Sequence, residues 1–134
     1  MDELVKWLGE QLDEDKRIAQ ATTDRQPYDE WGAAGDDREG ETARKFWSVV
    51  SIASMEQIPA ARDLATFIAE HDPARVLREI EAKRQALAHF ERIRQHARQG
   101  DEAYVLAEGA VSKQIQIMAT AYADRPGYLE KWRP

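Results

Sequence analysis

The spacing of hydrophobic residues at the start of the chain predicts a helix. From Asp2 to about Thr22 the apolar positions recur with the period of about 3.6 residues that an α-helix requires. These positions are Leu4, Trp7, Leu8, Leu12, Ile18 and Ala19. Asp2 and Glu3 stand in the first turn, where the helix dipole favours negative charge. We therefore expect a helix over residues 2–22.

Residues 23–54 lose this periodicity and predict a loop followed by a hairpin. Pro27 and three glycines interrupt a polar stretch that ends near Glu41. The segment "FWSVVSIA", residues 46–53, is rich in β-branched and aromatic side chains and indicates a strand. Its partner is expected near Tyr28 to Trp31. A lone hairpin is marginal in water, so its apolar side should lie against the helices.

The second half of the chain predicts three more helices, at about 59–70, 73–99 and 101–123. Asp72 followed by Pro73 is typical of a helix start, because Asp accepts from a free backbone amide and proline is tolerated at the first helical position. Gly100 suits the end of that helix and Asp101 the start of the next. Two long helices joined by so short a connection should pack antiparallel. The apolar positions of the helix over 73–99 are Val76, Ile80, Leu87, Phe90, Ile93 and Ala97. In the helix over 101–123, Leu106, Ala110, Ile117 and Ala121 flank a central row of Val111, Ile115, Met118 and Tyr122.

The C-terminal turn and tail, residues 124–134, complete the predicted architecture. Pro126 and Gly127 form a turn from which Tyr128 and Trp132 can fold back onto the helices. A chain of 134 residues has the size of one ordinary domain. The predicted fold is therefore a single domain, residues 1–134, of class α+β, mainly α, with antiparallel helices and a small β-hairpin packed against them.

Composition narrows the function classes. The absence of cysteine excludes disulfides, thiolate metal sites and a cysteine nucleophile. The first residues lack the order of a signal peptide, and no apolar run reaches the roughly 18 residues of a membrane span. We expect a cytoplasmic protein that does not interact with membranes.

Charge is divided unevenly along the chain. Residues 1–45 hold thirteen acidic and seven basic side chains, whereas residues 73–99 hold seven basic and three acidic ones. The acidic segment could pack beside the basic helix, or the basic helix could meet an anionic partner. The candidate binding arginines are Arg75, Arg78, Arg92 and Arg98. The low pI of about 5.1 argues against nucleic acid.

Candidate catalytic and metal residues receive little support. His71 beside Asp72 resembles the pair of metal-dependent hydrolases, but those sites need an earlier histidine and His71 is the first. His89 and His96 share a helix face with arginines, which would repel a cation. The sequence therefore predicts no catalytic residue, no metal and no cofactor, although a small enzyme using scattered Asp, Glu and His stays an open alternative.

Aromatic residues are the other binding candidates, because exposed Trp and Tyr beside Arg form hot spots for protein partners. They are Trp31, Trp47, Tyr128 and Trp132. Packing in the core is the alternative and commoner role for such side chains.

Three segments carry a family resemblance: "DELVKWLGEQLDEDKRIAQATT", "FIAEHDPARVLREIEAKRQAL" and "YADRPGYLEKWRP". They resemble an uncharacterised family of small actinobacterial and actinophage proteins with "HDPARVL" and "YAD-PGY-WRP" motifs. This sequence departs from that pattern at "DRQPYDEW" and at Arg125. The resemblance implies a phage or actinobacterial origin and transfers no catalytic residue.

These observations favour a protein of unknown function that acts as a non-enzymatic protein-interaction module. It would dock through the aromatic tail and the hairpin, onto a protein partner or a second copy of itself. The alternative is a nucleic-acid or nucleotide binder that uses the Arg-rich helix 73–99. Arginines paired with the acidic N-terminal segment would favour the first function, and free arginines the second.

Overall fold

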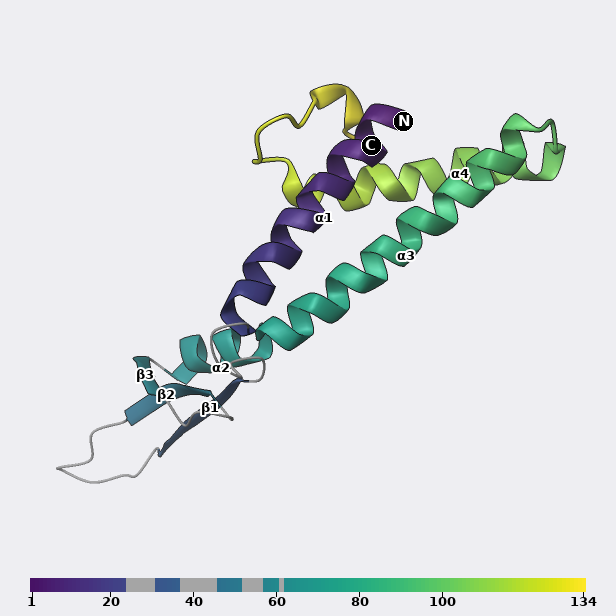
Figure 1. The fold of residues 1–134 in the computed structure, drawn as a ribbon. Helices are drawn as coiled ribbons and strands as arrows, with labels where there is room; N and C mark the ends of the chain where they lie inside the picture. The colour runs from purple at the N-terminus through teal and green to yellow at the C-terminus, as the bar shows by residue number, and fades with distance from the viewer. Residues whose placement is uncertain (24–30, 37–45, 52–56, 61) are drawn as a thin grey trace. The chain divides into compact units, whose positions relative to one another are not determined.

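A computed structural model describes residues 1–23, 31–36, 46–51, 57–60 and 62–134 (Figure 1). The chain divides into two compact units, one of residues 1–15 with 80–134 and one of residues 16–79. Each unit is described by itself, and the single domain stays a prediction. The elements are α1 (Asp2–Thr23), β1 (Trp31–Asp36), β2 (Phe46–Ser51), β3 (Gln57–Ala60), α2 (Arg62–Glu70), α3 (Pro73–Arg98), α4 (Glu102–Ala119), η1 (Thr120–Tyr122) and η2 (Glu130–Trp132).

The core of the first unit lies along α1. Leu4, Leu8 and Leu12, one helical turn apart, are completely buried, and so is Phe90 of α3. Asp2 pairs with Arg94 and Arg98, whereas Asp13 pairs with Arg84. Because low numbers on α1 meet high numbers on α3, the two helices run antiparallel. The predicted apolar face of α3 is confirmed at the buried Ile80, Leu87, Phe90, Ile93 and Ala97.

The turn between α3 and α4 forms as its residues predict. Gly100 takes a positive φ of 89°, which glycine adopts without strain, and its amide donates to the carbonyl of Ala97 at 3.0 Å. A side-chain oxygen of Asp101 accepts from the amide of Ala103 at 3.1 Å and caps α4. Helix α4 then runs back along α3 (Figure 1), which confirms the predicted antiparallel pair.

The C-terminal tail returns along α1. Arg125 pairs with Asp15, and Lys131 pairs with Glu3 at 2.7 Å. Trp132, in η2, is 6% exposed and packs with Trp7. The predicted fold-back of the tail is therefore confirmed.

The second unit contains a three-stranded antiparallel sheet in the order β1-β2-β3. Trp31 is opposite Ser51 and Asp36 is opposite Phe46 in the first pair. Trp47 is opposite Ala60 in the second. Helix α2 packs against β1 and β2, and its Ala65 is completely buried.

The predicted fold class is wrong in its β part. The described strands form a three-stranded sheet in which β2 is paired on both sides, not a two-stranded hairpin. Residues 57–60 form β3 where the sequence indicated a helix start at 59. Pro59 lies in this edge strand, where a missing backbone amide is tolerated. A third strand also supplies the stability that an isolated hairpin lacks.

None of the helices that the structure describes combines the length and the apolar character that crossing a bilayer needs.

Candidate interaction surfaces

His71 and Asp72 form a helix start. A side-chain oxygen of Asp72 accepts from the backbone amide of Arg75 at 2.7 Å, and Pro73 is the first residue of α3. The His71 ring stacks on Phe67 at 4.3 Å, and its Nδ1 lies 2.8 Å from the Phe67 carbonyl oxygen. Both side chains therefore have local structural partners, as the capping prediction requires. Across the described ranges, no three His, Asp or Glu side chains gather as they would around a metal.

Two of the four predicted binding arginines, Arg75 and Arg98, are paired with carboxylates. The Nε of Arg75 lies 3.0 Å from Glu79, and its Nη1 lies 3.4 Å from Glu70. Arg98 lies 3.0 Å from Asp2. Among the residues that the structure describes, Arg98 is thus the one of the four that pairs with a carboxylate of the acidic segment 1–45.

The other two predicted arginines, Arg78 and Arg92, are exposed. Neither forms an ion pair with any described residue. They lie fourteen positions apart in the sequence, Arg78 in the second unit and Arg92 in the first. Within the described residues, each unit therefore holds one of the four candidate arginines without a carboxylate partner, whereas phosphate binding needs several cations on one side.

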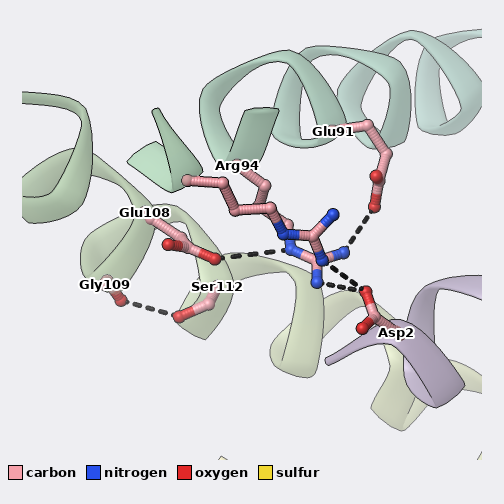
Figure 2. A network of polar contacts seen from close by, with 7 residues as sticks. Asp2, Glu91, Arg94, Glu108, Gly109 and Ser112 are labelled. Carbon is pink, nitrogen blue, oxygen red and sulfur yellow. Dashed lines mark hydrogen bonds and ion pairs between the residues drawn. The ribbon is translucent and has the colours of Figure 1, made fainter. Parts of the chain in front are cut away.

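Arg94, which the sequence did not single out, is the most connected charge of the first unit. Its guanidinium is 5% exposed and lies among Glu91 of α3, Glu108 of α4 and Asp2 of α1 (Figure 2). Burial would lower the pKa of Arg94, but hydrogen bonds to Asp2 and Glu91 outweigh it and raise the pKa. The hydrogen bond from Arg94, and then its charge, hold the pKa of Asp2 below its ordinary value. The network ties three helices together, and Arg94 itself is buried within it.

The two predicted tail aromatics belong to a cluster around Trp7. The ring of Trp7 lies 5.6 Å from that of Tyr128 and 5.3 Å from that of Trp132. The Trp7 Nε1 donates to the Pro126 carbonyl at 3.1 Å. Gly127 has a φ of 87°, and a Cβ built on it would lie 2.9 Å from the Trp7 Nε1. The tail aromatics are therefore used inside the unit.

Trp31 and Trp47 both lie in the sheet, but their side chains lie outside the part of the chain that the structure describes. Trp31 begins β1, and Trp47 is opposite Gly35 on one side and Ala60 on the other. Their role as binding residues stays a prediction.

The largest exposed apolar side chains of the first unit gather on α4. Leu106 is 79% exposed, Ile117 55% and Val105 50%. Residues 103, 106, 110, 113, 117 and 120 follow one another at spacings of three and four, so they form one stripe along the helix. We call this stripe the outer face of α4; it consists of Ala103, Leu106, Ala110, Lys113 and Ile117 together with Thr120, the residue that caps the end of the helix, all exposed.

The outer face lies opposite the side of α4 that packs against the unit. Ile115 and Ala119 are buried at 1% and 0% exposed. At 100° per residue, their mean direction is about 180° from that of Leu106 and Ile117. The helix is thus apolar on two sides, and one of them is open. The signal in the sequence was the wide apolar stripe of this helix.

The whole chain, residues 1–134, matches the sequence model of a family of unknown function, DUF6221. The chain belongs to this family. No curated protein and no solved structure matches the chain significantly. Membership of DUF6221 therefore brings no activity, substrate or partner to the surfaces described above.

Proposed function

We propose that this chain is a non-enzymatic protein-interaction module and that its contact surface is the outer face of α4. The supporting observation is the exposure of Leu106 and Ile117 on one side of a helix whose other side is already buried. Water-exposed apolar side chains that line up on one face are typical of surfaces covered by another protein. Covering them would remove apolar area from water and stabilise the complex.

This proposal places the contact elsewhere than in the aromatic tail. Trp132 is 6% exposed, and both tail aromatics contact Trp7. Using them to hold a partner would require removing them from their own unit. The outer face of α4 needs no such rearrangement, because its side chains are already in solvent.

The proposal also covers the origin of the protein, its location and the kind of partner it binds. From the motifs in the sequence we infer a phage or actinobacterial origin, and from the absence of cysteine a cytoplasmic location, with a protein as partner. An actinobacterial lysate is therefore the appropriate source in which to search for that partner.

Nucleic-acid binding is the alternative function, and the charges give it less support. Arg75, Arg94 and Arg98 are paired with carboxylates. Retention of labelled DNA or RNA at low salt, lost steeply as salt rises, would favour this alternative. We expect no such retention.

A site-specific photocross-linker tests the proposed function. It is placed at position 106 in one full-length variant and, as a matched control, at the exposed Gln95 of α3 in another. After irradiation in an actinobacterial lysate, we expect discrete protein adducts at position 106 and none at position 95. Equal or absent labelling at the two positions would contradict the assignment of the contact to α4.

A further inference from the structure

We infer that the partner of the outer face of α4 is a second copy of the same helix, packed antiparallel in a symmetric dimer. This inference rests on the proposed function and names its partner. It comes from the order of side chains along the stripe, which is self-complementary when one helix is reversed. The inference depends on four side chains of this stripe: the exposed Leu106 and Ile117, the small Ala110 and the charged Lys113.

The register follows from the spacing of three and four residues. Such a stripe forms the seam of a two-helix coiled coil. With the two-fold axis between positions 111 and 112, Leu106 faces Ile117 of the second copy. The same register sets Ala110 against the partner's Lys113 and Ala103 against the partner's Thr120. Leu106 and Ile117, the two large apolar side chains, thus pack against each other, and Lys113 packs against the small side chain of Ala110.

Charge favours the antiparallel over the parallel direction. A parallel pair in register would place Lys113 directly opposite Lys113 and Glu102 directly opposite Glu102, and like charges in contact destabilise a complex. The antiparallel register offsets the two Lys113 residues by about 4.5 Å along the axis, so its main advantage is the separation of the Glu102 side chains. In the antiparallel pair the two Glu102 side chains are about 28 Å apart along the axis. The methylene stem of Lys113 can lie over the partner's Ala110 with its ammonium group in water.

Backbone space near the axis fits close approach of a second helix. Gly109 lies beside the outer face, and a Cβ built on it would have no neighbour within 4 Å in the part of the chain that the structure describes. A glycine inside a helix costs stability relative to alanine. A second helix could approach α4 closely at Gly109, because this residue has no side chain in the way.

The size of the face sets the strength of the dimer. Helix α4 has 18 residues and is about 27 Å long. A pair of single helices of this length buries less than the roughly 800 Å² per partner of a standard interface. The dimer is therefore weak and dissociates on dilution, and the two Lys113 side chains near the axis weaken it further.

Cross-linking through single cysteines tests the register, because the chain has no cysteine of its own. Full-length Ala110→Cys, Leu106→Cys and the control Gln95→Cys are treated with a short bismaleimide cross-linker. In the proposed dimer the two copies of residue 110 are offset by about 4 Å along the axis, and those of residue 106 by about 16 Å. We expect covalent dimer from Ala110→Cys at roughly ten times the yield of the other two variants or more.

Other outcomes would overturn the inference. Equal yields from positions 106 and 110, both above the control, would mean parallel packing. Yields at all three positions equal to the control would mean that the dimer does not form. In the photocross-linking experiment, an adduct of twice the chain mass supports the dimer. An adduct with a different protein alone would preserve the proposed function and reject the second copy as partner.

Sedimentation equilibrium gives a measurement that does not depend on cysteine. We expect Lys113→Leu to tighten the dimer roughly tenfold or more, because it replaces a charge at the seam with an apolar side chain. Leu106→Glu should leave only monomer. Since both positions are exposed, circular dichroism should show unchanged helix content in both variants. An unchanged dissociation constant in both would contradict the predicted seam.

Discussion

The C-terminal tail and the outer face of α4 hold apolar side chains under opposite conditions. The tail is short and irregular, yet Trp132 is 6% exposed because Trp7 receives it. The outer face belongs to a regular helix, yet Leu106 is 79% exposed. Regular apolar spacing therefore did not determine what is buried. A side chain is buried where a complementary surface reaches it, and the tail meets such a surface whereas this face of α4 does not.

Removing the centre of the tail cluster should give the largest effect. Trp7→Ala deletes a ring that is 8% exposed and contacts both tail aromatics. Truncation of a buried Trp costs about 3–5 kcal/mol of the free energy of unfolding. Urea denaturation followed by circular dichroism measures this loss. A loss below about 1 kcal/mol would mean that the tail is not part of the core.

Two glycine-to-alanine substitutions compare how the backbone of the tail and the backbone of α4 tolerate an added Cβ. Gly127→Ala should destabilise by about 1–2 kcal/mol or more, because φ is 87° and the new Cβ would lie 2.9 Å from Trp7. Gly109→Ala, in open helix, should stabilise by about 0.5–1 kcal/mol. Thermal unfolding of both variants at low protein concentration checks the opposite signs. Equal shifts would contradict the close contact of the tail with Trp7.

The tail also predicts a pH dependence through Glu3. The hydrogen bond from Lys131, and then its charge, hold the pKa of Glu3 below its ordinary value of 4.5. A carboxylate with a lowered folded-state pKa stabilises the fold above its unfolded-state pKa, and this stabilisation is lost as pH falls through the folded-state pKa. Glu3→Gln should therefore lower the melting temperature slightly at pH 7. The difference from the parent should disappear in acid, below pH 4.5.

The smallest effect is expected on the open side of α4. Leu106→Ala should change the free energy of unfolding by less than about 0.5 kcal/mol, since a side chain that is 79% exposed loses little packing. The measurement belongs at protein concentrations where no dimer forms. A large loss there would mean that the face is covered within the chain, and it would remove the basis of the proposed contact.

Local chemistry explains which features could be predicted without coordinates. The four helices, the cap at Asp72, the end of α3 at Gly100 and the start of α4 at Asp101 depend on residues a few positions apart. Short-range periodicity and capping are sufficient for these. The β region was predicted less well: "FWSVVS" indicated β2, but Pro59 was placed at the start of a helix when it lies in an edge strand. A strand is stabilised by its neighbours, so its own residues do not specify how many it has.

By itself, the sequence determined that four helices form, the starts of α3 and α4 at Asp72 and Asp101, which helix faces are apolar, and that the tail can turn at Pro126 and Gly127. Only the tertiary structure decided that Arg94 would be held by Asp2, 92 positions away, and that Trp7 would donate to Pro126, 119 positions away. It also decided which of the two apolar sides of α4 would stay in solvent. The reason is that helix formation depends on nearby residues, whereas burial and ion pairing depend on surfaces that distant parts of the chain bring together.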